Sequence, residues 1–256
     1  MKYFHNKNDK KNVKLTIVCA MRNVVHCVED FFRSYQDAYT VDTQLIVMDC
    51  ASSDGTWEII LRYRNIIDIA ISELDDGIYH AWNNALPYCE GEYVSFIGAD
   101  DRIAAGGVKD LITAINNAVN KPDIIAGFNI LTRNSVPVAL FGAPYDSNGL
   151  HRRMMIAHVM SAHKVRWLLS VNGFDATFRS SGDYELLLRE RKFLRINVIN
   201  SVLAYVEDGG ISRSTLIPFF ENFRARKKNG VALWLCTALL LRVLLGFIAR
   251  KLKLYR

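Results

Sequence analysis

The feature that most constrains this fold is an alternation between short apolar runs and amphipathic stretches, which begins at Lys14. The apolar runs are residues 15–20, 45–48, 66–71, 93–97 and 123–128, and the amphipathic stretches between them are residues 24–35, 56–61, 78–86 and 107–119. Short apolar runs are typical of strands buried on both faces, whereas amphipathic stretches are typical of helices with one buried face. The alternation therefore predicts an α/β domain with a mostly parallel central sheet flanked by helices.

The second half of the chain is less regular. Proline and glycine mark loops at Pro137 and at residues 144–149. A helix is expected to begin near Asp183, and strands at residues 196–199 and 202–206 lead to a Gly-Gly-Ile-Ser segment at 209–212.

The excess of positive charge lies at one end of the chain. There are 32 Lys and Arg residues against 26 Asp and Glu residues, a net charge of +6. Nine of the basic residues and none of the acidic ones follow Glu221, so residues 1–221 carry a net charge of −3. A domain without a basic surplus is a poor electrostatic partner for a phosphate polymer, so the sequence predicts no nucleic-acid binding.

The cysteines and the first residues indicate the compartment. The five cysteines include no CxxC pair, so they are expected to be buried free thiols in a reducing environment. Residues 1–13 form a polar segment that lacks the apolar stretch of a secretory signal. Both observations predict a domain in the cytoplasm.

Three carboxylates follow predicted strands directly. Asp49 follows the second apolar run, and Asp100 and Asp101 follow the fourth. In open α/β sheets ligands bind beyond the carboxyl ends of the strands. Two adjacent carboxylates repel each other unless a charge offsets them, and a divalent Mg²⁺ or Mn²⁺ ion that holds a diphosphate would do so. The alternative is that the Asp-Asp pair only caps the following helix.

Several segments, taken together and in order, resemble the motifs of one enzyme family. They are Thr16-Ile17-Val18 with Asn23, residues 46–56 (IVMDCASSDGT), 72–84 (SELDDGIYHAWNN), 91–101 (GEYVSFIGADD), 173–175 (GFD) and 182–189 (GDYELLLR). Residues 14–212 thus resemble a family 2 glycosyltransferase with the Rossmann-like GT-A fold, of the kind that builds bacterial surface polysaccharides.

The resemblance implies a role for five carboxylates. Asp49 matches the residue that hydrogen-bonds the nucleotide base, and Asp76 matches a residue that lines the nucleotide-sugar pocket. Asp100 matches the first member of the DXD-like pair, near the ribose, and Asp101 matches the second, which ligates the metal ion. Asp183 matches the general base that removes the proton of the acceptor hydroxyl.

The same resemblance implies a metal-dependent, inverting transfer with Mn²⁺ or Mg²⁺. The donor is expected to be a nucleotide-diphosphate sugar, with UDP favoured. The acceptor is expected to be a glycan or a polyprenyl-diphosphate-linked glycan in O-antigen, capsule or exopolysaccharide synthesis.

Other interpretations compete with these roles. Asp183 could be only the N-cap of its helix, and His158 and His163 could approach the site or be structural. Cys50-Ala51 stands where the family often has a glycine-containing pair. The competing function is a catalytically inactive relative that acts as a membrane-bound scaffold. A nucleotidyltransferase is disfavoured because no Gly-rich loop with a paired Arg or Lys follows the first strand.

The C-terminal segment predicts a membrane contact. Residues 231–249 are apolar except for Thr237, Arg242 and Gly246. A spanning helix needs about 20 apolar residues, and an arginine at its centre costs about 2.5–3.5 kcal/mol, so a helix lying in the headgroup region is favoured over a spanning one. The basic cluster at 224–228 is expected to add attraction to anionic lipid.

The predicted organisation is therefore a polar segment (1–13), a GT-A domain (14–221) and a membrane-associating tail (222–256). This places the protein on the inner face of the plasma membrane. The alternative is that the tail packs against the domain or against a second copy of the chain, which would make a homo-oligomer.

Overall fold

A computed structural model describes residues 1–6, 12–208 and 215–253 of the chain. The strands in these residues are β1 (Lys2–His5), β2 (Leu15–Met21), β3 (Thr43–Asp49), β4 (Ile69–Ser72), β5 (Tyr93–Gly98), β6 (Arg102–Ile103), β7 (Ile124–Arg133), β8 (Val136–Phe141), β9 (Ala162–Lys164) and β10 (Ile196–Glu207). The α-helices are α1 (Val28–Ala38), α2 (Thr56–Arg62), α3 (Ile78–Ala85), α4 (Gly107–Asn117), α5 (Val165–Ser170), α6 (Gly182–Glu190), α8 (Ile217–Lys228) and α9 (Leu233–Lys253).

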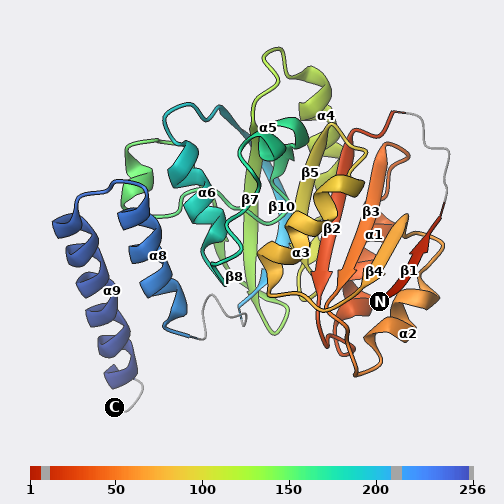
Figure 1. The fold of residues 1–256 in the computed structure, drawn as a ribbon, viewed down its shortest axis with the longest axis horizontal. Coiled ribbons are helices and arrows are strands. Elements are labelled where there is room, and N and C mark those ends of the chain that lie inside the picture. Colours follow the sequence, from red (N-terminus) through yellow and green to blue (C-terminus); the bar gives the residue numbers. More distant parts are fainter. Residues whose placement is uncertain (7–11, 209–214, 254–256) are drawn as a thin grey trace.

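All the described strands join one sheet, in the order β1-β4-β3-β2-β5-β9-β7-β10-β6, and β8 pairs with β7. The adjacent strands β4, β3, β2 and β5 are parallel, as are β7 and β10. Helices cover both faces of this sheet, while α8 and α9 lie together to one side of it (Figure 1). The predicted class, an α/β fold with a mostly parallel central sheet, is confirmed.

Two hydrophobic cores lie on opposite faces of the sheet, because successive side chains of a strand point to opposite faces. Leu15, Ile17 and Cys19 of β2 pack with α1, α2 and α4. Val18 and Ala20 pack with α3 and α6. Since both faces are covered, the central strands are apolar throughout, which is why the sequence shows runs rather than alternation.

The structure differs from the predicted elements at the margins of the sheet. None of β1, β6 and β8 was predicted: β6 has two residues, and β8 (VPVALF), although apolar in sequence, contains Pro137, which the sequence analysis assigned to a loop. The two strands predicted at 196–199 and 202–206 are one strand, β10, whose pairing with β7 shifts register between Val198 and Val202. The Gly-Gly-Ile-Ser segment at 209–212 lies outside the described residues.

Three of the four cations in the basic cluster at 224–228 contact the domain. Arg226 is only 6% exposed and donates to the carbonyls of His151 and Arg152. Lys228 lies 2.6 Å from an Asp175 carboxylate oxygen and 3.1 Å from one of Glu185. The guanidinium of Arg224 lies 3.7 Å from the ring centroid of Phe178. Of the four cations only Arg226 is buried, whereas Arg224, Lys227 and Lys228 remain exposed, so attraction of this cluster to anionic lipid stays a prediction.

The predicted tail forms most of α8 and all of α9, and α8 attaches it to the domain. The predicted boundary between residues 221 and 222 lies inside α8, which packs on α6. The rings of Phe219 on α8 and Phe247 on α9 are 5.9 Å apart, and α9 lies on the side of α8 away from the sheet (Figure 1). No helix in the described part of the chain, α9 included, has the length and apolar content that crossing a bilayer requires.

Candidate active site

The strand ends bring the predicted carboxylates to one edge of the sheet. In the pairing of parallel strands, Met21 at the end of β2 lies opposite Asp49, and Ala20 lies opposite Gly98. Asp49 and the Gly98–Asp101 segment therefore flank the end of β2 on its two sides. This is the edge where parallel α/β sheets bind ligands.

Asp49 is a buried carboxylate with fixed orientation. It is 2% exposed and accepts a hydrogen bond of 2.6 Å from the Ser72 hydroxyl, at the end of β4. The amide of Ser52 donates to it at 3.1 Å. Ala51, between these partners, has a left-handed φ of 45°, a conformation that favours glycine, which agrees with the glycine often found near this position in the family.

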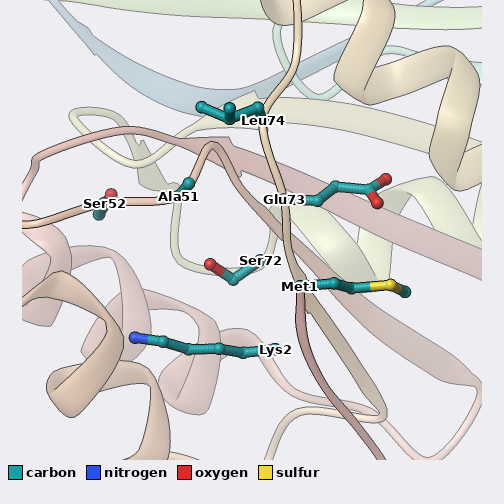
Figure 2. Close-up of a pocket in the computed structure, with 7 residues that line it drawn as sticks. All are labelled: Met1, Lys2, Ala51, Ser52, Ser72, Glu73 and Leu74. Carbon is teal, nitrogen blue, oxygen red and sulfur yellow. The ribbon is translucent and has the colours of Figure 1, made fainter.

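A pocket of about 400 Å³ opens beside these partners of Asp49 (Figure 2). Its lining residues are Met1, Lys2, Ala51, Ser52, Ser72, Glu73 and Leu74. The edge strand β1 therefore contributes to the pocket, a role that the polar composition of residues 1–13 did not predict. The Lys2 ammonium lies 5.5 Å from the ring centroid of Trp57, so it stands over α2 beside this pocket.

Asp76 lies in the loop before α3, next to the end of β3. The Cys50 thiol lies 3.8 Å from the carbonyl of Asp75, so this loop borders the strand that ends in Asp49. The side chain of Asp76 is exposed, while its amide donates to Nδ1 of His80 at 3.1 Å. The structure thus brings Asp76 to the same edge as Asp49.

Asp101 is buried and Asp100 is exposed. Asp101 is 7% exposed, and one of its carboxylate oxygens accepts a hydrogen bond of 3.1 Å from the amide of Glu207 at the end of β10. Burial and the neighbouring Asp100 carboxylate raise the pKa of Asp101 well above its usual value. The pair precedes β6, and α4 begins only after Gly106, so the alternative that the pair caps a helix is wrong.

The two carboxylates fit a divalent cation. A Cβ atom placed on Gly98 would lie 2.6 Å from Oδ1 of Asp100 and 3.7 Å from Oδ2 of Asp101, so both groups turn toward the same space above this glycine. Hard cations such as Mg²⁺ and Mn²⁺ prefer such oxygen donors. Within the described residues no group of three or more His, Cys, Asp or Glu side chains is arranged to hold a metal ion. The chain would therefore supply two carboxylates and leave the other coordination positions to phosphate oxygens and water.

Asp183 is a half-buried carboxylate in the first turn of α6. The hydroxyl of Tyr79 on α3 donates to its Oδ1 at 3.1 Å. Burial raises the pKa of Asp183 to about 6, although hydrogen bonds from the Tyr184 amide and from Tyr79 oppose this rise. The N-cap position belongs to Ser181, so Asp183 is not the cap residue. A Cβ on Gly182 would lie 2.8 Å from the Tyr79 ring, so glycine permits the close approach of α3 and α6.

The histidines are structural in this arrangement. His158 and His163 have ring centroids 5.0 Å apart and pack among Trp82, Phe96 and Phe174. Burial lowers the pKa of His158 to about 4, and burial also lowers that of His163. Both rings are therefore neutral near pH 7.

The chain matches known glycosyltransferases in sequence. Residues 16–142 match the family model described as Glycosyl transferase family 2. The poly(ribitol-phosphate) β-N-acetylglucosaminyltransferase TarS of Staphylococcus aureus is 28% identical over 109 residues, which are 41% of this chain and 19% of TarS. The putative teichuronic acid biosynthesis glycosyltransferase TuaG of Bacillus subtilis is 30% identical over 91 residues, 34% of this chain and 36% of TuaG. The aligned part thus spans about a fifth of TarS and a third of TuaG.

The fold is shared with solved glycosyltransferases. The structure of S. aureus TarS 1–349 in complex with UDP-GlcNAc has a TM-score of 0.68 at 18% identity and covers 89% of this chain and 70% of that one. The mannosyltransferase PcManGT of Pyrobaculum calidifontis, in complex with GDP-Man and Mn²⁺, has a TM-score of 0.62 at 15% identity. The match covers 99% of this chain and 84% of PcManGT. The chain therefore contains a family 2 glycosyltransferase domain and has the GT-A fold.

Proposed function

We propose that this chain is an inverting, metal-dependent glycosyltransferase that moves a sugar from a nucleotide-diphosphate donor to a hydroxyl of a glycan or lipid-linked acceptor. The observation that carries the proposal is the pairing of two features. Buried carboxylates at the ends of β3 and β5 offer a donor site, and a carboxylate with a pKa of about 6 on α6 offers a base.

The donor site is built around Asp49. The pocket beside Ser52 and Ser72 accepts the nucleotide base, with Asp49 as the buried acceptor of its N–H groups and Asp76 at the rim. Asp100 lies toward the ribose. UDP is the favoured nucleotide because the TarS structures with a similar fold hold UDP-GlcNAc and UDP.

Asp101 would hold the divalent ion, while Asp100 beside it lies toward the ribose. Bound there, a divalent ion would supply Lewis-acid stabilisation of the negative charge on the leaving diphosphate. The mannosyltransferase with a similar fold holds Mn²⁺, which supports this assignment. The chain's own contribution is the buried, raised-pKa carboxylate of Asp101, whose charge is costly without a cation.

Asp183 acts as the general base. Its carboxylate accepts the proton of the acceptor hydroxyl while the acceptor oxygen forms a bond to the anomeric carbon, and the bond from that carbon to the diphosphate oxygen breaks. Attack from the face opposite the leaving group inverts the anomeric configuration. A base with a pKa of about 6 is ionised near pH 7 and yet basic enough to take the proton.

The relatives and the tail both support the proposed acceptor class. TarS and TuaG carry names that place them in cell-wall polysaccharide synthesis, which supports an acceptor in a bacterial surface polysaccharide, free or polyprenyl-diphosphate-linked. Exposed apolar side chains on α9, among them Leu241, Leu245 and Ile248, support peripheral attachment to the inner membrane face, where such lipid-linked acceptors lie.

A thermal-shift experiment tests the donor site. UDP-GlcNAc with Mn²⁺ is expected to raise the melting temperature of the chain. A ligand at about 100 times its Kd adds about 2.7 kcal/mol of stability. Asp101→Ala should abolish the metal-dependent part of the shift, whereas Asp37→Ala, which removes an exposed carboxylate from α1, should keep it.

Two outcomes would contradict the proposal. No shift with UDP, GDP, dTDP or CMP sugars, in a protein shown to be folded, would favour the inactive scaffold. A product that retains the donor's anomeric configuration would exclude the single-displacement mechanism.

A further inference from the structure

Three consecutive backbone amides converge on one carboxylate at the start of α6. The amide of Arg179 donates to Oε1 of Glu221 at 2.8 Å. The amides of Ser180 and Ser181 donate to Oε2 at 2.8 and 2.9 Å. Glu221 lies on α8, about 40 residues further along the chain, and is 9% exposed. The segment that it holds ends two residues before Asp183.

This contact is strong for electrostatic reasons. Amides that precede a helix have no intrahelical partner, and the N-terminus of a helix carries partial positive charge. A carboxylate that accepts several of them forms charge-assisted hydrogen bonds, which are shorter and stronger than neutral ones. Both oxygens of Glu221 are engaged, so the direction in which the chain enters α6 is fixed at three successive residues.

The helix that carries Glu221 is itself anchored. Ala225 is fully buried in the core, and Arg226 donates to the Tyr184 hydroxyl of α6 at 3.1 Å. Lys228 at the end of α8 contacts Glu185, also on α6. Glu221 therefore acts from a rigid support, and it reaches the backbone on the N-terminal side of the proposed base rather than the base itself.

We propose that Glu221 is a positioning residue that fixes Asp183 in its catalytic orientation through the backbone of residues 179–181. The inference rests on the proposed function, in which Asp183 takes the acceptor's proton. It extends the catalytic unit to α8, a helix outside the segment 14–212 that resembles the family.

Glu221 also affects the charge state of Asp183. The titratable and charged groups around Asp183 are Tyr79 on α3, Glu221 on α8, and Glu185 on its own helix, which is paired with Lys228. The negative charge of Glu221 adds to the rise in the pKa of Asp183. Removing this charge should lower that pKa, so the acidic limb of a pH–rate profile should move to lower pH.

The experiment combines amide exchange with kinetics on the full chain. Hydrogen–deuterium exchange of residues 179–181 is compared in the wild type, Glu221→Gln, Glu221→Asp and the control Glu190→Gln. The control removes a carboxylate from the last turn of α6, at the end opposite Asp183. The same proteins are assayed for hydrolysis of UDP-GlcNAc with Mn²⁺ between pH 5 and 9, and for UDP binding by thermal shift.

In Glu221→Gln, the backbone amides of residues 179–181 are expected to exchange at least about 10-fold faster than in the wild type. The reason is that the glutamine side chain has one accepting oxygen for three backbone donors. Its kcat should fall about 10-fold, since small misplacements of a catalytic group are costly. The acidic limb of its pH–rate profile should move to lower pH. The rise in its melting temperature on UDP binding should equal that of the wild type. Glu221→Asp keeps the charge, so its acidic limb should stay in place while kcat falls. Glu190→Gln should match the wild type.

The outcomes separate this inference from the proposed function. Faster exchange in Glu221→Gln with an unchanged kcat and pH profile would make Glu221 merely structural and overturn the inference. Unchanged exchange would also overturn it. If Glu221→Gln does not fold, a wild-type kcat in Glu221→Asp would overturn it too. A wild type that neither binds UDP nor hydrolyses any sugar nucleotide would overturn the proposed function, and the role of Asp183 with it, whatever the exchange shows.

Discussion

A carboxylate that works as a base near neutral pH costs the protein stability when it is ionised. The pKa of Asp183 is raised from 3.8 in the unfolded chain to about 6 in the fold, so the folded state holds the proton more tightly. The fold is therefore favoured by this group below pH 4, and that contribution is lost as the pH rises through 6. Asp183 is ionised, and unfavourable, at the pH where it would act.

The substitution Asp183→Asn separates function from stability. Transfer should fall by about 10²–10⁴-fold, the usual contribution of a general base. The melting temperature at pH 7.5 should rise above that of the wild type, because the buried charge is gone, and the difference should shrink as the pH approaches 4. Differential scanning calorimetry and UDP release measure the two effects. A variant that keeps its transfer rate would remove Asp183 from the mechanism.

The substitution Tyr79→Phe should move the pH profile in the direction opposite to Glu221→Gln. The Tyr79 hydroxyl stabilises the ionised form of Asp183 and so lowers its pKa. Without it the pKa rises further, so the acidic limb should move to higher pH, and the rate at pH 6 should fall more than the rate at pH 8. Phenylalanine keeps the packing of the ring against Phe174. Equal losses at both pH values would mean that the hydroxyl acts only on structure.

At the scale of elements, the sequence predicted the central strands and the carboxylates that follow them, because both depend on local patterns. The central strands are apolar because both of their faces are covered, and carboxylates that follow parallel strands must lie at one edge of the sheet. The amino-acid sequence was therefore sufficient to place Asp49, Asp100 and Asp101 at that edge. The strands β6 and β8 were missed, since one has two residues and the other contains Pro137, which indicated a loop.

The rest of the candidate site depends on contacts between distant elements. The hydroxyl of Ser72 meets Asp49 from 23 residues away, and Tyr79 meets Asp183 from 104 residues away. Glu221 reaches the start of α6 from a helix that the sequence assigned mostly to a membrane-binding tail. Hydropathy alone cannot tell a lysine or arginine that pairs inside the fold from one that faces lipid. Packing decides this: Arg226 is buried against the domain, while Arg224, Lys227 and Lys228 stay exposed.

At the scale of the whole molecule, α9 is the outermost part of the tail. Helix α9 lies at the end of the molecule opposite β1 (Figure 1). Trp234, Leu241, Leu245 and Ile248 are each more than half exposed on it. Large exposed apolar surfaces mark places where another surface docks. For an enzyme whose proposed acceptor is lipid-linked, a bilayer interface suits an apolar helix that also carries an exposed Arg242.

The double substitution Leu241→Glu/Leu245→Glu tests this attachment. The wild type should sediment with anionic vesicles at low salt, through apolar insertion and attraction of basic groups to the headgroups. Each leucine buried in lipid contributes about 1.5–3 kcal/mol, so the double variant should bind at least 10-fold more weakly, and its UDP-dependent thermal shift should be unchanged. Leu61→Glu, at an exposed leucine on α2, is the control and should sediment like the wild type. If the wild type stays in the supernatant and light scattering gives the mass of a dimer that the double substitution breaks, the α9 face binds a second copy of the chain instead of the membrane.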